Sequence, residues 1–172
     1  MKHLKILGSL CALIVIIINS SCSARTPTVS PGLQASYLKQ IGIADINRSL
    51  TITLSSQNAY KPGTDIEFDI HNMSPYEVLL PADYGAKIFM ARDTGWLELK
   101  NNLEYHGEVE LLSAASGPLL SEFPAIVRPA FGPDVNLQPQ NIVRILVAGE
   151  LMNGQAKPVS QVGAYVDIIL TR

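Results

Sequence analysis

The sequence predicts an all-β protein, folded as an antiparallel sandwich or barrel, and three observations support this. Apolar and polar residues alternate with period two over Leu50–Ser55 and over Asp65–His71, which is typical of strands with one buried face. Further short apolar runs follow at similar spacing, separated by glycine, proline and asparagine. No amphipathic helical stretch of useful length interrupts the series.

Residues 1–21 are predicted to be an export signal. Lys2 and Lys5 form a short positive region, and Ile6 to Ile18 then form an uncharged apolar run of thirteen residues. A membrane-spanning helix needs about 20 apolar residues, so this run is short for one. An uncleaved N-terminal anchor helix is the alternative interpretation.

Cys22 is the predicted attachment point of a lipid. Residues 20–22 fit the last three positions of the pattern that this stretch resembles, the lipobox of bacterial lipoproteins, whereas Asn19 departs from that pattern. Cys11 leaves with the leader, so Cys22 has no cysteine partner in the mature chain, and a lone exported cysteine is reactive, intermolecular or modified. Cleavage after Ala24 by a general signal peptidase is the other possibility. A lipid on Cys22 would anchor the protein in the cell membrane or the outer membrane, with the folded part outside the cytoplasm.

The rest of the chain divides into a tether and one domain. Residues 22–48 are rich in proline, serine and threonine at their start and are predicted to be a flexible tether, with Leu38–Asn47 open between an edge strand and one helical turn. Residues 49–172 are predicted to be the folded domain. Within it, Ser113–Gln140 combines five prolines with several large apolar residues. Proline excludes a long central strand there, so we expect a crossover that covers one end of the sandwich, or else a partner-binding loop.

A family resemblance covers roughly 40 residues of this domain. The segments "YKPGTDIEFDIHNMSPYEVLLP" and "DYGAKIFMARDTGWLEL" resemble the opening strands of bacterial immunoglobulin-like modules. The span Tyr60 to Leu99 is similar to the intracellular proteinase inhibitor domain called BsuPI, although the export signal departs from an intracellular inhibitor. The resemblance implies an antiparallel immunoglobulin-like sandwich of about seven to nine short strands, and the whole chain resembles a surface lipoprotein with one such domain.

Composition and motifs argue against several classes of function. The formal net charge of −2 becomes −4 once Lys2 and Lys5 leave with the signal, and no basic run provides a nucleic-acid footprint. The folded domain has no thiol, and the chain lacks a nucleophile elbow, a P-loop, a dinucleotide fingerprint and a zinc-protease motif. We therefore expect no catalytic role and no cofactor.

The sequence contains two possible metal sites. Asp65, Glu67 and Asp69 share one strand face, but at about 6.8 Å between alternate residues the outer pair is too far apart to chelate one ion. His71 and Met73 form a His-x-Met pair that suits Cu(I), with Met90 and His106 as further candidate ligands. We therefore predict no metal site. An exported copper carrier remains the second alternative function.

The remaining hypothesis is a binding module. By strand order, the loop around Met73 to Tyr76 and the loop around Asn153 to Lys157 are predicted to lie at the same end of the sandwich. Candidate binding residues are Met73, Tyr76, Tyr84 and Asn153, although the two tyrosines can also simply cap the core. We expect a monomeric, lipid-anchored scaffold for an envelope protein or glycan, and a proteinase inhibitor using a sandwich-end loop is the first alternative.

Overall fold

The computed structural model describes most of the predicted domain and part of the predicted tether. Residues 1–21, predicted to be an export signal, and Cys22 lie outside the described residues, so the expectations about them are not addressed by the fold. The described residues are 27–41, 51–57, 59–106, 110–112, 121–133, 135–138 and 140–171.

The described residues contain one helix and ten strands, which confirms the predicted all-β class. The strand count exceeds the expected seven to nine, because short pieces such as the two-residue β2 and the three-residue β4 and β7 pair as separate strands. The elements, in chain order, are α1 (Pro31–Ile41), β1 (Ile52–Ser56), β2 (Ala59–Tyr60), β3 (Ile66–Asn72), β4 (Val78–Leu80), β5 (Lys87–Arg92), β6 (Gly95–Leu99), β7 (Glu110–Leu112), β8 (Ser121–Val127), β9 (Ile142–Met152) and β10 (Pro158–Leu170).

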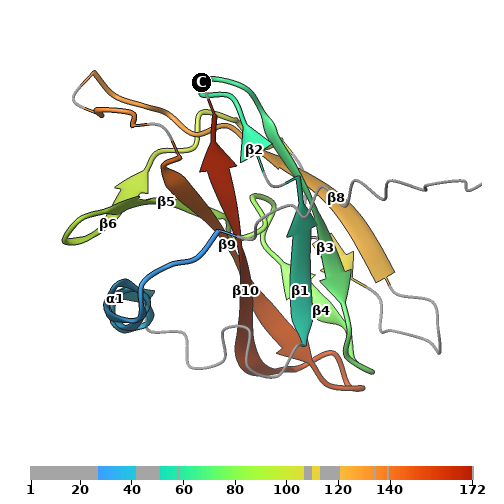
Figure 1. The fold of residues 1–172 in the computed structure, drawn as a ribbon. Coiled ribbons are helices and arrows are strands. Elements are labelled where there is room, and N and C mark those ends of the chain that lie inside the picture. The colour runs from blue at the N-terminus through green and yellow to red at the C-terminus, as the bar shows by residue number, and fades with distance from the viewer. Residues whose placement is uncertain are drawn as a thin grey trace, which may run out of the picture.

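The strands form two sheets that face each other (Figure 1). One sheet has three strands in the order β1-β3-β8, and the other has seven strands built around the long hairpin of β9 and β10. The first half of β9 pairs with β5 and its last residues pair with β4, so a single strand supports two successive partners.

The main core lies between the two sheets. In β3, Ile66, Phe68 and Ile70 are buried and alternate with more exposed acidic residues, as the period-two pattern predicts. Their apolar neighbours across the core come from the seven-stranded sheet, for example Ile145 and Ala164. Burial of this apolar face is the main force that holds the two sheets together.

The expectation of purely antiparallel strands is wrong for one pair. β2 runs parallel to the end of β10, with Ala59 opposite Ile169. The backbone N–H of Thr171 also donates to the carbonyl oxygen of Tyr60 at 2.8 Å. Because β1 belongs to the three-stranded sheet and β2 to the seven-stranded one, this short stretch of chain joins both sheets along one side.

The prediction of a flexible tether over residues 22–48 does not hold for residues 31–41, which form α1. Ser30 caps the helix by accepting a hydrogen bond from the backbone N–H of Leu33, and Pro31 occupies the first helical position, where its missing N–H costs nothing. Tyr37 is fully buried, and Leu33 and Ile41 on the same helix face are partly buried with it. The segment is therefore a docked helix and part of the folded unit.

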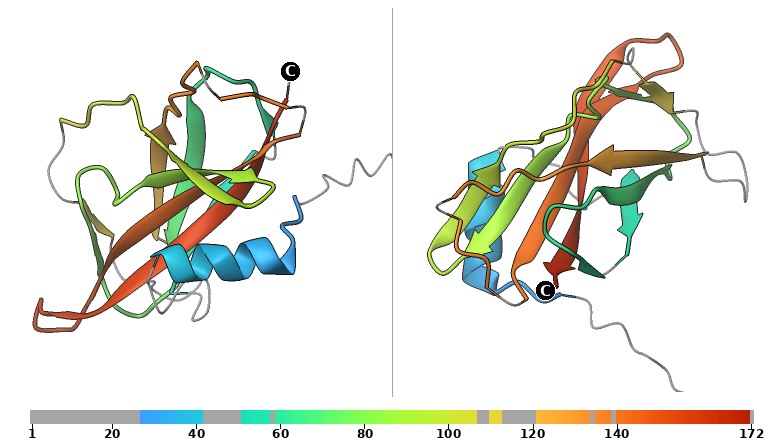
Figure 2. Two further views of the ribbon diagram at one scale, coloured as in Figure 1. Left: turned by 90° about the vertical axis from the view of Figure 1, so that its left-hand side faces the viewer. Right: turned by 90° about the horizontal axis from the view of Figure 1, so that it is seen from above.

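The helix packs on the outer face of the seven-stranded sheet (Figure 2). Its apolar face meets Phe89 of β5, Trp96 of β6 and Leu146 of β9, which form a second core with Tyr37. As a result the middle of β9 is covered on both sides, and its residues 143–147 are all buried.

Among the described residues, the prolines of Ser113–Gln140 keep a central strand out of this segment, as expected, but an edge strand forms there in place of part of the expected crossover. Residues 121–127 form β8, with Pro124 opposite Asp69 of β3. β8 lies at the edge of its sheet, where the missing N–H of a proline can face away from the ladder, so the strand tolerates it. Residues 113–120 of the segment lie outside the described residues.

Candidate functional site

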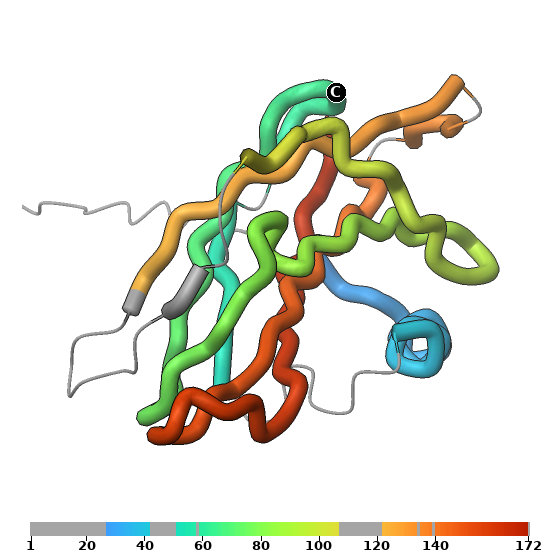
Figure 3. Tube along the Cα trace, turned by 180° about the vertical axis from the view of Figure 1, so that it is seen from behind, coloured from blue at the N-terminus to red at the C-terminus, as the bar shows by residue number. Residues whose placement is uncertain are grey.

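The two loops predicted to share one end of the sandwich do so. The β3–β4 turn and the β9–β10 turn lie together at the lower edge of Figure 3. The backbone N–H of Met152 donates to the carbonyl oxygen of Glu77 at 2.8 Å, which links the two segments directly. Between them is an open hollow of about 300 Å³, lined by residues 75–77 and 152–156. We call residues 73–77 and 152–159 together the loop-end surface.

The β3–β4 turn is held by a buried asparagine. Asn72 is fully buried, its Nδ2 donates to the carbonyl oxygen of Tyr76 at 2.8 Å, and its Oδ1 accepts from both the backbone N–H and the hydroxyl of Ser74. The backbone N–H of Met73 is tied to the carbonyl of Thr51 at 2.8 Å. The turn is thus rigid, and it leaves the side chains of Met73 and Tyr76 exposed to 43% and 50%.

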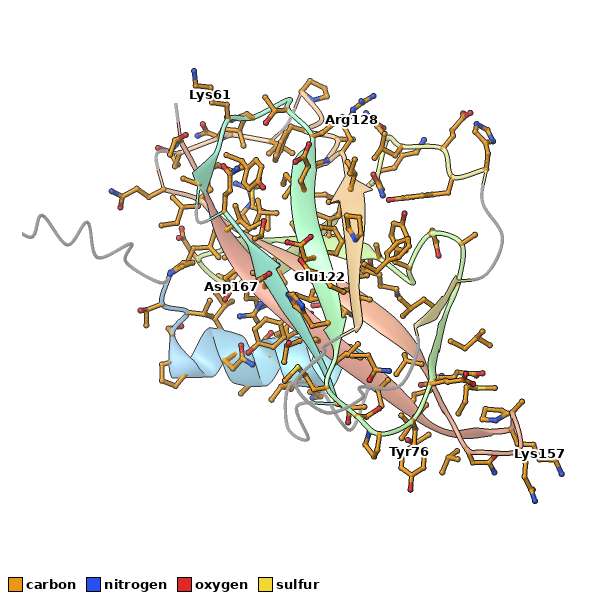
Figure 4. All side chains as sticks on the ribbon, turned by 90° about the vertical axis from the view of Figure 1, so that its right-hand side faces the viewer. Lys61, Tyr76, Glu122, Arg128, Lys157 and Asp167 are labelled. Carbon is orange, nitrogen blue, oxygen red and sulfur yellow. The ribbon has the colours of Figure 1, made fainter. Side chains whose placement is uncertain are left out.

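Asn153 plays a structural part in the β9–β10 turn. Its Oδ1 accepts the backbone N–H groups of Gln155 at 2.9 Å and Lys157 at 3.0 Å. Its own N–H donates to the carbonyl of Lys157 at 2.9 Å, so hydrogen bonds between the first and last residues close the five-residue loop 153–157. Asn153 therefore lies on the loop-end surface as predicted, but the oxygen of its side chain is already used to shape the loop. Figure 4 shows Tyr76 and Lys157 at the same end of the molecule, far from Lys61 and Arg128.

A β-bulge adds a further apolar side chain to this end. The register of β10 against β9 shifts between Pro158 and Ser160, and Val159 in between is 63% exposed. Bulges re-aim side chains out of the regular alternation of a strand. Val159 could not be predicted from the sequence, because a bulge leaves no distinct signal in an alternating run.

Tyr84 belongs to a different part of the molecule. Its ring packs edge-on against Tyr105 at 5.4 Å between centroids and at 5.6 Å from Phe123. It is partly buried against the main core, and it has a positive φ of 59° in the turn between β4 and β5. The structure therefore gives Tyr84 the core-capping position that was the alternative to a binding role.

The four candidate copper ligands are not brought together. Met90 is fully buried and belongs to the core between the sheets, whereas His71 alternates with core residues and lies on the opposite face of β3. Met73 and His106 are exposed on turns and loops. Within the described part of the chain, no group of three His, Cys, Asp or Glu side chains is placed to hold a metal ion.

His71 instead makes a cross-strand contact with Ser55. Its Nε2 lies 2.9 Å from the Ser55 hydroxyl, a distance also found between a nucleophile and its base. The other ring nitrogen, Nδ1, is buried and has no hydrogen-bond partner among the residues that the structure describes. A catalytic triad needs an acidic group at that position to orient the ring, so the pair lacks the third member.

Sequence reasoning missed a buried charged cluster that fixes α1 to the sheet. Arg144 is 1% exposed and forms two hydrogen bonds with Asp167, opposite it on β10, at 2.6 and 2.7 Å. Its third hydrogen bond goes to Oε1 of Gln34 on α1 at 2.6 Å. The guanidinium also lies within 4.5 Å of the ring centres of three aromatic residues, namely Tyr37, Trp96 and Tyr165.

This Arg144 cluster is structural in character. Trp96 donates from Nε1 to the carbonyl of Leu33 at 2.9 Å, and Gln34 donates to the hydroxyl of Tyr165 at 3.0 Å, so the helix is held by polar as well as apolar contacts. Burial raises the pKa of the Tyr37 hydroxyl well above its usual value, and no group in the described part of the chain forms a hydrogen bond with that hydroxyl. The one signal of this cluster in the sequence was a pair of opposite charges in the middle of two neighbouring apolar strands.

Comparisons with known proteins find no relative: no protein-family model matches the chain, and searches of curated proteins and of solved structures return no match. Over the described residues, no helix is long and apolar enough to cross a membrane.

Proposed function

We propose that this protein is a lipid-anchored, extracytoplasmic binding module without catalytic activity, and that it binds an envelope protein through the loop-end surface. The observation that carries the proposal is the exposure of Tyr76 and Met73 on a turn that internal hydrogen bonds hold rigid. Tyrosine and methionine are enriched in protein interfaces, and rigid loops lose little entropy on binding. The hollow of about 300 Å³ beside Tyr76 offers space for one partner side chain.

The strand order supports an immunoglobulin-like assignment of the sandwich. The neighbours β4-β9-β10 correspond to strands C, F and G of that fold, and β1-β3-β8 correspond to A, B and E. The loop-end surface then consists of the B–C and F–G loops, which carry recognition in variable domains. This correspondence concerns the fold alone, so the choice of a protein partner rests on the side chains.

The position of α1 supports an orientation in which the loop-end surface faces away from the membrane. Leu33 near the start of the helix contacts Trp96, whereas Gln40 and Ile41 at its end line a groove with Gly85 and Ala148. The helix thus begins on the side away from the β9–β10 turn (Figure 2). If Cys22 carries the lipid, only the residues up to Ser30 form a spacer, with a typical reach of about 15 Å.

Photo-crosslinking tests the binding surface. A photoreactive phenylalanine analogue at position 76 is expected to give a discrete adduct with an envelope protein in intact cells, and the adduct should disappear when Met73→Ser and Val159→Ser are added. The matched control places the same analogue at Ile126, which is 39% exposed on the three-stranded sheet. Equal crosslinking at both positions, or none at position 76, would contradict the proposal.

The anchor and the inhibitor alternative have separate tests. Cys22→Ala is expected to abolish labelling by a radioactive fatty acid and to release the protein from the membrane fraction. Unchanged membrane retention would favour an uncleaved N-terminal helix. Inhibition of a protease at near-stoichiometric ratios, lost in Tyr76→Ser, would replace the scaffold interpretation with that of an inhibitor.

A further inference from the structure

A second open hollow lies at the opposite end of the sandwich from the loop-end surface. Its volume is about 570 Å³, and it lies between the β5–β6 turn and the segment that leads into β9. In Figure 1 both segments are on the same side of the molecule. Seven of its nine lining residues are polar, and four of these carry carboxamide side chains, namely Asn136, Gln138, Gln140 and Asn141. We call it the amide hollow.

The backbone of the amide hollow is fixed. Oδ1 of Asn141 accepts the backbone N–H of Gln138 at 2.6 Å, and the N–H of Asn141 donates back to the carbonyl of Gln138 at 3.3 Å. The turn is also tied to the end of β10, because the N–H of Leu170 donates to the carbonyl of Asn141 at 2.9 Å. Gln140 between them has a positive φ of 67°, which a non-glycine residue keeps only where its surroundings enforce it.

The opposite wall supplies the remaining polar groups. Arg92 spans the hollow, since its Nη1 donates to the carbonyl of Asn136 at 3.2 Å. Asp93 and Thr94 follow in the β5–β6 turn. Among the described residues, the side chains of Asp93, Thr94, Asn136 and Gln138 make no hydrogen bond, so their donors and acceptors are available to a ligand.

This inventory fits a ligand whose groups both donate and accept. Apart from the Asn141 oxygen, which already accepts the N–H of Gln138, the carboxamides offer N–H donors and carbonyl acceptors, Asp93 adds acceptors, and Arg92 adds donors. Sugar hydroxyls have this dual character, and neighbouring hydroxyls can pair with the two ends of one carboxamide. With one cation and one anion in the lining, the site has no net charge to select a phosphate or another anion.

A peptide fits the amide hollow less well. Peptide recognition relies on apolar pockets for side chains or on strand addition to a free sheet edge. The apolar residues lining the amide hollow are Ala91 and Ile142, both only partly exposed, and they form no pocket of their own. We propose that the amide hollow is a binding site for a neutral oligosaccharide, separate from the protein-binding surface.

Ligand-observed saturation-transfer NMR tests this proposal. The full chain is purified in a detergent without a sugar headgroup and titrated with four neutral tetrasaccharides built from α-glucose, β-glucose, mannose and N-acetylglucosamine. At least one is expected to receive saturation at concentrations of about 1–10 mM. In the double variant Asn136→Ala/Gln138→Ala, loss of two hydrogen bonds should weaken binding about tenfold or more.

The matched control is Gln57→Ala/Gln161→Ala, which also removes two exposed carboxamides but away from the amide hollow and from the loop-end surface. Its sugar binding should equal that of the parent protein. Absence of saturation transfer to all four sugars overturns the proposal, and so does equal binding by both double variants. Displacement of a bound sugar by unrelated tetrapeptides at equal concentration would assign the site to peptides instead.

Discussion

Replacing Arg144 by methionine is expected to unfold the helix-binding side of the protein first. Arg144→Met keeps a long side chain in place but removes both hydrogen bonds to Asp167 and the one to Gln34. It also removes the cation from the three surrounding rings. The carboxylate of Asp167, 12% exposed, is left without its partner in a site that water barely reaches.

The magnitude follows from this burial. Removing one member of a buried, hydrogen-bonded ion pair costs about 3–5 kcal/mol, because the other charge stays buried and uncompensated. A domain of this size has a free energy of unfolding of about 5–15 kcal/mol, so the substitution removes a large share of it. Arg144→Met/Asp167→Leu, which removes both charges, should recover half of the loss or more, since a well-packed apolar pair is often as stable as the ion pair.

Urea unfolding measures the effect with two probes. Trp96 is the single tryptophan and contacts α1 directly, so its fluorescence reports on helix docking, while far-ultraviolet circular dichroism reports on the sheets. The control is Arg128→Met, which breaks a similar two-bond pair with Asp65 at the surface and should leave the urea midpoint unchanged. A loss below about 1 kcal/mol in Arg144→Met, or no recovery in the double variant, would refute the reasoning.

Three smaller predictions follow from other sites. Tyr37→Phe should raise the free energy of unfolding by about 1 kcal/mol at pH 7, because the hydroxyl is buried with no hydrogen-bond partner within the described ranges. Burial also raises the pKa of Tyr37, so the unfolded chain ionises first above about pH 10, and the wild type should lose stability there more steeply than Tyr37→Phe. Gly149→Ala should lower the midpoint temperature of thermal unfolding, because the new Cβ would lie 2.6 Å from the carbonyl oxygen of Leu79. Gly95→Ala serves as the control, because open space surrounds the position of its new Cβ. Ala156→Gly should stabilise the β9–β10 turn by about 1 kcal/mol in urea unfolding, because φ is 55° at this position; no gain there would mean that the turn is not strained.

The strands and the loop-end surface were predictable from local patterns. Period-two alternation located β3 because one face of that strand is buried and the other is wet, and strand order placed the turns near Tyr76 and Asn153 together. Helix α1 was missed because its start, Ser30 and Pro31, has the composition of a loop, and only three apolar residues at helical spacing mark its buried face. The parallel pairing of β2 depends on two residues and has no local signal.

The Arg144 cluster could not be predicted from local patterns, for a more general reason. The cluster also matters for how the proposed sites would work. A charge within an apolar run costs free energy unless a partner is present, and the partner Asp167 lies on another strand while Gln34 lies on a helix that the pattern did not reveal. Once made, these contacts join α1 rigidly to β9 and β10.

If the lipid precedes α1, force on the anchor passes through this cluster into the sheet. The amide hollow, in the turn just before Trp96, would then face the anchored side, and the loop-end surface would face away from it. If both proposals hold, two sites at opposite ends of one rigid unit would keep a glycan and a protein at a set distance, which a flexible tether over residues 22–48 would not do.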